Sequence, residues 1–189
     1  MKRVVTVLVI LFGLLAFAPV AAAASPRENF DNAGFDAFGS QCGQQTCTDT
    51  NFFADRQTTA SGEVFSFACV DQFTYNIRTG RGTDVGGCLD GVDFTVAGDL
   101  SSASLPATQF EVCQRNNCRT ITVSANLTAT GSSATFRSRY TERDGTCTFT
   151  YSDSGQSRSA IGSVTFDGSV VAVDGSIRSG KTTVTSKCK

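Results

Sequence analysis

The chain has 189 residues, among them 8 Cys, 15 Phe, 18 Gly, no His and no Trp, and its formal net charge is −1. Without histidine the chain cannot run Ser-His or Cys-His catalysis, and it lacks the commonest metal ligand and the usual charge switch near neutral pH. A hydrophobic content of 40% argues against disorder of the whole chain, and the length suits one domain.

The first predicted element is a helical signal peptide over residues 1–24. Lys2 and Arg3 precede an apolar run over residues 4–17, and Ala24 ends a small-residue segment typical of cleavage sites. The apolar run is shorter than the about 20 residues of a spanning helix, and no second long run follows. We therefore expect cleavage near Ala24, secretion, and no membrane association afterwards. Loss of the two basic residues lowers the basic count from 16 to 14 against 17 acids, so the net charge becomes −3.

All eight cysteines follow the predicted cleavage site. They are Cys42, Cys47, Cys69, Cys88, Cys113, Cys118, Cys147 and Cys188. An even number in an exported chain predicts four disulfides, and the absence of C-x-x-C spacing and of histidine argues against metal thiolate sites. The two C-x4-C units each flank four polar residues, as cross-strand pairs in hairpins do. The simplest pairing is Cys42 with Cys47, Cys69 with Cys88, Cys113 with Cys118, and Cys147 with Cys188.

After the signal peptide we predict an irregular N-terminal segment over residues 25–60, with an edge strand and a disulfide loop. Residues 61–189 are predicted to form an antiparallel β domain, because apolar and polar residues alternate in short runs throughout it. Phe65, Phe67 and Phe73 share one such face, and Ile121 with Val123 share another. Four Asp-Gly dipeptides are typical of tight hairpin turns, and they begin at Asp90, Asp144, Asp167 and Asp174.

The fold class that follows is an all-β, antiparallel β-sandwich, with a β-barrel as the alternative, stabilised by four disulfides. Thirteen phenylalanines follow the signal peptide, and most are expected in the core. Phe52 and Phe53 are adjacent and cannot both point inward from one strand, so one of them is a candidate contact residue. Two C-x4-C units, each followed by a Phe-Thr-Tyr triplet, leave open an ancient duplication, although the later cysteine spacings differ.

Residues 175–182 match the phosphate-loop pattern G-x-x-x-x-G-K-T. That loop functions because a helix follows it and directs backbone N–H groups at phosphate. Here only a short, β-branched tail follows, so the segment is predicted to be a turn between the last two strands. The sequence predicts no cofactor and no metal site.

A possible binding stripe is formed by Arg137, Arg139 and Arg143, which share the parity of one strand. Such a stripe suits an anionic polysaccharide, a sulfate group or an acidic protein, and the competing interpretation is an ordinary solvated strand face. No aromatic residues interleave with these arginines as in a stacking platform, so nucleic acid is not an expected partner.

An enzyme without histidine would need a facing pair of carboxylates, as in polysaccharide hydrolases, and Glu63, Glu111 and Glu142 are the candidates. Because carboxylates are normally surface charges, we predict no catalytic residue. The favoured function is a non-catalytic binding or structural protein outside the cell, with an unknown extracellular ligand or surface as partner. A binder of small apolar ligands with a Phe-lined interior, and the carboxylate-dependent hydrolase, remain as alternatives.

Overall fold

A computed structural model describes residues 27–188, and the predicted signal peptide lies outside this range. The described chain consists of ten strands without a helix, paired antiparallel, which confirms the all-β antiparallel class. The strands are β1 (Arg27–Cys42), β2 (Thr46–Thr59), β3 (Val64–Asn76), β4 (Gly82–Asp90), β5 (Thr95–Val96), β6 (Ser102–Gln114), β7 (Asn117–Ala129), β8 (Ala134–Asp144), β9 (Cys147–Phe166) and β10 (Ser169–Cys188).

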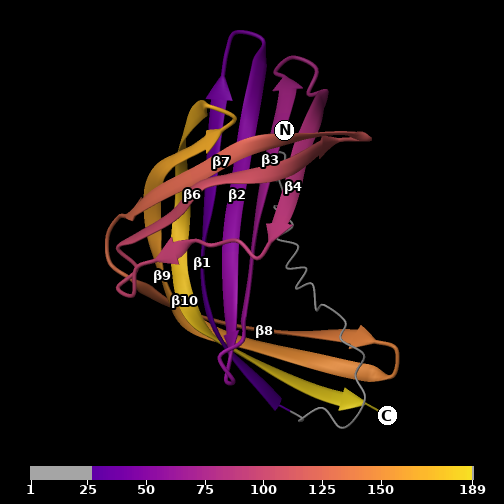
Figure 1. Cartoon of the computed structure of the whole chain (residues 1–189), viewed down its shortest axis with the longest axis vertical. Coiled ribbons are helices and arrows are strands. Elements are labelled where there is room, and N and C mark those ends of the chain that lie inside the picture. The colour runs from indigo at the N-terminus through magenta and orange to yellow at the C-terminus, as the bar shows by residue number, and fades with distance from the viewer. Residues whose placement is uncertain (1–26, 189) are drawn as a thin grey trace.

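The ten strands form one continuous sheet that closes on itself. Its order is β10-β1-β2-β3-β4-β6-β7-β9-β8, and β5 pairs with β6 beside this path. An additional pairing between β10 and β9 completes a ring that leaves β8 outside it. The ring corresponds to the barrel alternative rather than to two separate sheets. The pairing between β4 and β6 is the shortest in the ring, because it consists of the single residue pair Gly86 with Cys113. Figure 1 shows β6 and β7 crossing in front of the long upright strands, so that two layers of the same sheet enclose the interior.

The core lies between these two layers. Phe35 of β1 is completely buried, and its ring centroid lies 5.4 Å from that of Phe52 on β2 and 5.7 Å from that of Phe94, just before β5. Phe110 and Val123 close the core from the crossing strands. The interior is therefore filled by rings in contact, and burial of each such side chain contributes about 1.5–3 kcal/mol.

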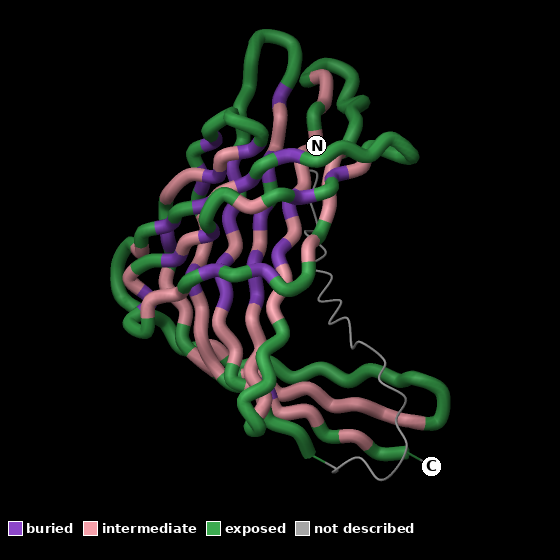
Figure 2. Tube along the Cα trace, viewed as in Figure 1, coloured by how far each residue is buried: buried purple, intermediate pink, exposed green. Residues whose placement is uncertain are grey.

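A second part of the sheet projects from this body, and we call it the arm. It comprises β8 together with residues 147–157 of β9, 178–188 of β10 and 27–32 of β1. In Figure 2 the buried positions concentrate in the body, whereas the arm is mostly exposed or half-buried. Gly155 and Gly180 pair directly where the arm joins the body. A Cβ atom on either glycine would collide with the backbone of the facing strand, so glycine permits the close approach there.

The four predicted disulfides are confirmed, with the predicted pairing. Each joins two directly opposed residues of neighbouring antiparallel strands, with Cα atoms 4.0 to 4.1 Å apart. The bonds therefore fix the register of β1 on β2, β3 on β4, β6 on β7, and β9 on β10. Such bonds form and persist in an oxidising environment.

The segment from residue 27 to 59 differs from the irregular structure predicted for it. It forms β1 and β2, two long strands paired along thirteen positions, and each also pairs with a further neighbour. Two features of this segment favour strands: the disulfide closes the hairpin, and Phe35, Ala37, Phe52 and Ala54 alternate with polar residues in the manner of a half-buried sheet.

The expectation that most phenylalanines are buried is wrong. Only five of the thirteen lie in the core, and on β3 the aromatic face points outward while the alternate residues Ala68 and Val70 are buried. The reason is space, because the rings of Phe35 and Phe52 already fill the interior beside β3 and leave room only for small side chains. The outward rings are Phe53, Phe65, Phe67, Phe73 and Tyr75. Of the adjacent pair, Phe52 is buried and Phe53 is half-buried, packed edge-on against Phe67.

Two of the four predicted Asp-Gly hairpin turns are confirmed, because Gly145 joins β8 to β9 and Gly168 joins β9 to β10, both with positive φ. Gly91 also has positive φ, but it follows β4 in a connection to β5, and these two strands do not pair with each other. The fourth prediction is wrong, as is the turn predicted for residues 175–182, since both segments lie inside β10. Residues 182–185 are β-branched and continue the ladder with β9. Gly175 and Gly180 occupy places where a neighbouring backbone comes too close for a side chain.

Truncation of a buried and of an outward phenylalanine should reduce stability by very different amounts. Phe35→Ala removes a ring that is 0% exposed and should cost about 3–5 kcal/mol of unfolding free energy. Phe65→Ala removes a ring from a residue that is 46% exposed and should cost about 1 kcal/mol or less. Urea unfolding of both variants measures the difference. Equal losses would mean that β3 presents its other face to the core.

The disulfides should differ in their contribution according to the chain length they enclose. Cys147 and Cys188 are 41 residues apart and Cys113 and Cys118 only 5. Loop entropy then predicts about 4 kcal/mol for the first bond and about 2 kcal/mol for the second. Replacing each pair by serine and comparing urea midpoints checks the order, and a larger loss from the shorter loop would contradict it.

Candidate functional site

The arm gathers positive charge on one of its two faces. Arg137, Arg139 and Arg143 project from β8 on the same side as Lys181 and Lys187 of β10, because direct cross-strand neighbours share a face. Arg27 of β1 belongs to the same side through its pairing with Thr185. We call these six residues the cationic face. The structure thus keeps the predicted arginine stripe together and adds three cations from distant parts of the sequence.

Hydroxyl groups fill the space between the two rows of cations. On the cationic side β9 presents Thr148, Thr150, Ser152 and Ser154, which lie between the arginines of β8 and the lysines of β10. Asp31 is the carboxylate on this side of the arm strands, and its Oδ1 lies 3.7 Å from Lys181 Nζ. Within residues 27–188 none of the three arginines forms an ion pair. Their guanidinium groups are therefore available to a ligand.

A shallow hollow of about 390 Å³ adjoins the cationic face where the arm meets the body. Lys181 and Thr183 of β10, Asn29 and Asp31 of β1, and Ser154 of β9 contribute to its lining. Another hollow, of about 510 Å³, lies at Ile161 and Asp174, away from the arm. The cationic face is otherwise an open surface, and the hollow beside Lys181 forms a polar depression at one end of it.

The opposite face of the arm carries a hydrogen-bond network centred on Asp153 of β9. Ser138 Oγ donates to Asp153 Oδ2 at 2.9 Å, and Thr182 Oγ1 donates to Asp153 Oδ1 at 2.7 Å. Asn32 Nδ2 of β1 in turn donates to Thr182 Oγ1 at 2.7 Å. The network joins the four strands of the arm, and from the opposite face it stabilises the arrangement of the strands that carry the cationic face.

A buried carboxylate lies next to this network. Arg178 reaches the Oδ1 atoms of Asp36 and Asp55 at 3.5 and 3.6 Å, and the Asp55 side chain is only 10% exposed. Burial raises the pKa of Asp55, the charge of Asp153 raises it further, and Arg178 opposes the shift. Arg178 thus links β10 to β1 and β2 beside the base of the arm.

Two tyrosines stack on the same non-cationic face. The rings of Tyr140 on β8 and Tyr151 on β9 are nearly parallel, with centroids 4.6 Å apart. Burial raises the pKa of Tyr140 to about 12, and the negative charge of Asp153 adds to the effect. The tyrosine therefore stays neutral, and this side of β8 carries aromatic and acidic residues where the other side is cationic.

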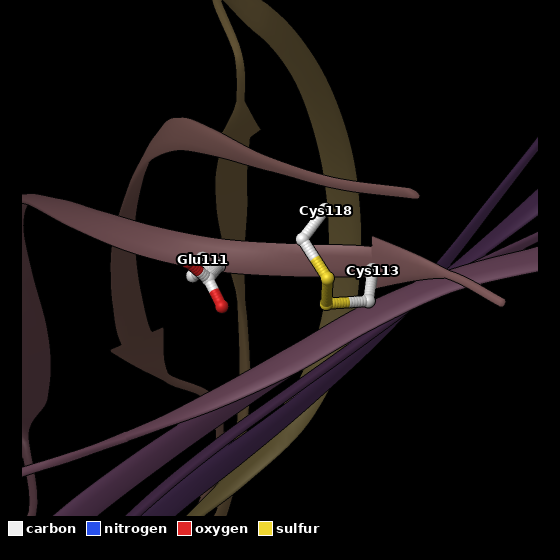
Figure 3. Close-up of side chains that lie close together, drawn as sticks. All are labelled: Glu111, Cys113 and Cys118. Carbon is white, nitrogen blue, oxygen red and sulfur yellow. A yellow bond between two sulfur atoms is a disulfide. The ribbon is translucent and has the colours of Figure 1, made fainter. Parts of the chain in front are cut away.

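The three glutamates considered for catalysis lie in separate parts of the fold. Glu63 is in the turn between β2 and β3, Glu111 on β6 faces Thr120, and Glu142 in the arm faces Phe149. Figure 3 shows Glu111 beside the Cys113 and Cys118 side chains. Because these two sulfurs are bonded to each other, they are not available as thiolate ligands for a metal.

Within residues 27–188 no helix has the length and apolar character needed to span a membrane. No protein family, curated protein or solved structure matches the chain. The function is therefore inferred from the arrangement of these side chains alone.

Sequence reasoning found the three arginines but missed Lys181, Lys187 and Arg27. Strand parity was visible for β8. The placement of β10 and β1 on the same side depends instead on pairings that bring together residues at least 44 positions apart, such as Arg139 and Thr183 through Ser152. The Asp36, Asp55 and Arg178 group was also missed. Its only signal was aspartate at outward positions of otherwise regular strands.

The raised pKa of Asp55 predicts a pH effect with a defined sign. A carboxyl whose pKa in the folded state is raised above its ordinary value of 3.8 destabilises the folded state when it is ionised. Stability is therefore gained as the pH falls through the folded pKa, and the full gain is present below the unfolded pKa. Between pH 7 and pH 4.5 the wild type should gain stability relative to Asp55→Asn, measured as the difference in urea midpoints. A relative loss would show that Arg178 outweighs burial.

Proposed function

We propose that the chain is exported and acts outside the cell as a non-catalytic binding protein, with the cationic face of the arm as its contact surface for an anionic partner. The observation that carries this proposal is the cluster of Arg137, Arg139 and Arg143 beside Lys181 and Lys187, in which the three arginines form no ion pair with any residue from 27 to 188. The chain as a whole has slightly more acids than bases. Six cations on one side of the arm therefore reflect a strong separation of charge.

The chemistry of the face suits carboxylate or sulfate groups. Guanidinium groups donate paired hydrogen bonds to such planar or tetrahedral anions, and the serine and threonine hydroxyls of β9 can donate as well. The surface is open and follows the strands, so an extended partner fits it better than a small molecule. Exposed ion pairs are individually weak, so binding should depend on several contacts made together.

The framework supports the same role. Cys147 and Cys188 join β9 to β10 at the far end of the arm, and the Asp153 network joins its strands nearer the body. A ligand that meets a preformed face need not order it, so less conformational entropy is lost on binding. Four disulfides also suit a protein that works in an oxidising environment.

The two other functions have less support. A binder of small apolar ligands would need free interior volume, and the rings of Phe35, Phe52 and Phe94 contact one another there. A carboxylate-dependent hydrolase would need two carboxyl groups facing each other across a cleft. Two carboxyl groups of the described chain have a raised pKa. Asp55 is covered and paired with Arg178. The pKa of Asp71 on β3 is raised by burial and by the charge of Asp84 on β4, and neither of these two residues lines either of the hollows described above.

Removal of the three arginines tests the proposed function. Arg137→Ala with Arg139→Ala and Arg143→Ala should weaken binding of dextran sulfate at least about tenfold, because three contacts of about 0.5 kcal/mol each are lost. Neutral dextran should not bind either protein. Isothermal calorimetry at low and moderate salt measures both affinities, and salt should weaken the wild-type interaction.

The matched control removes three other exposed arginines. Arg78→Ala, Arg81→Ala and Arg115→Asn change the net charge equally but lie in the turns after β3 and β6, and asparagine tolerates the positive φ of residue 115. This variant should keep wild-type affinity. If both triple variants lose affinity alike, only net charge matters and the cationic face is not the site.

A further inference from the structure

The strand β8 ends the hydrogen-bonded path of the sheet. It pairs with β9 along one side, and no strand within residues 27–188 pairs with its other side. The ladder with β9 runs without a register shift from Ala134 to Asp144, so eleven residues form a regular edge. All of them are exposed except Phe136, which is half-buried. A row of backbone N–H and C=O groups is therefore accessible for a further strand.

The two sides of this edge differ in chemistry. One side presents Arg137, Arg139 and Arg143. The other side presents Phe136 and Tyr140, with Ser138 between them and Glu142 and Asp144 toward the turn. Tyr140 is 41% exposed although it stacks on Tyr151. A strand added to β8 would place alternate side chains on these two sides. Acidic residues would meet the arginines, and apolar or aromatic residues would extend the row of Phe136 and Tyr140.

A second copy of the chain does not satisfy this pattern. Two β8 strands paired antiparallel about Tyr140 would set Arg137 of each against Arg143 of the other, and like charges directly opposite are destabilising. Charged side chains on an edge also oppose pairing with neutral strands. Both considerations select an occupant that carries negative charge at every second position.

We propose that the free edge of β8 binds an extended segment of a partner protein as an added strand, with acidic side chains on the cationic face and apolar side chains beside Tyr140. The inference rests on the proposed function, because it uses the same arginines, and it names the partner as a polypeptide. Main-chain hydrogen bonds give such complexes affinity, and the alternating side chains give them specificity.

The test uses the full-length mature protein and a fluorescein-labelled peptide of nine residues that alternates valine and glutamate. A block peptide of the same composition carries equal charge without the alternation. Two further peptides are N-methylated, one on every valine and the other on every glutamate. In an added strand only one of these two sets directs its N–H groups toward β8. Fluorescence anisotropy measures each affinity, and dextran sulfate is measured in parallel as in the test of the proposed function.

We expect the alternating peptide to bind at least tenfold more tightly than the block peptide, and one N-methylated peptide to lose at least tenfold more affinity than the other. Amide hydrogen exchange should slow along residues 134–144 when the alternating peptide is bound. Arg139→Ala should weaken the alternating peptide, whereas Arg78→Ala should not.

Other outcomes separate the two proposals. If dextran sulfate binds but the alternating peptide binds no better than the block peptide, or if the β8 amides gain no protection, strand addition is wrong while the cationic face stands. If neither dextran sulfate nor any peptide binds, the proposed function fails together with this inference. Binding of dextran sulfate alone would identify a polyanionic polysaccharide as the partner class instead.

Discussion

A single ladder of twenty residue pairs, from Cys147 with Cys188 to Phe166 with Ser169, joins β9 to β10 and extends through both parts of the molecule. Its body half pairs with β7 on one side and β1 on the other, and these pairings close the ring around the core. Its arm half pairs with β8 and with the start of β1. The disulfide at one end and the tight turn at the other hold the register of the ladder. A shift of one residue would exchange the two faces in the body and in the arm together.

This shared register explains how one alternation serves two environments. The positions of β10 that bury Val173 and Ile177 in the body continue into Lys181 and Lys187 in the arm. The alternation of side chains along β10 is the same in both parts, but the crossing strands β6 and β7 cover the sheet only in the body (Figure 1). The face that is apolar in the body is therefore cationic in the arm. The opposite face changes less, because half-buried aromatic residues such as Phe53 and Tyr151 occupy it in both parts. The candidate binding surface is therefore a continuation of the core face into solvent.

The pattern of local residues predicted much of this fold. Hairpin spacing predicted the Cys42–Cys47 and Cys113–Cys118 bonds, and Cys69–Cys88 and Cys147–Cys188 followed as the simplest pairing of the remaining cysteines. The face that is buried did not follow in β3, where the larger side chains point outward and Ala68 and Val70 point inward. The size and hydrophobicity of its side chains suggest which face of β3 is apolar. The space that Phe35 and Phe52 leave in the interior decides which face of β3 can pack against the core. The same limit applies to β10, where two glycines suggested a turn and instead relieve contact with the neighbouring strands.

For the candidate site, the sequence by itself excluded histidine chemistry and identified three of the six residues of the cationic face. A chain without histidine cannot use histidine chemistry in any fold, and Arg137, Arg139 and Arg143 share one side of any strand that contains them. Only the tertiary structure decided that Lys181, Lys187 and Arg27 lie on that side, that Glu63, Glu111 and Glu142 lie apart, and that β8 is an edge. Parity along one strand is a local property of the backbone, whereas the partners of a strand depend on ring closure and on contacts between residues far apart in the chain.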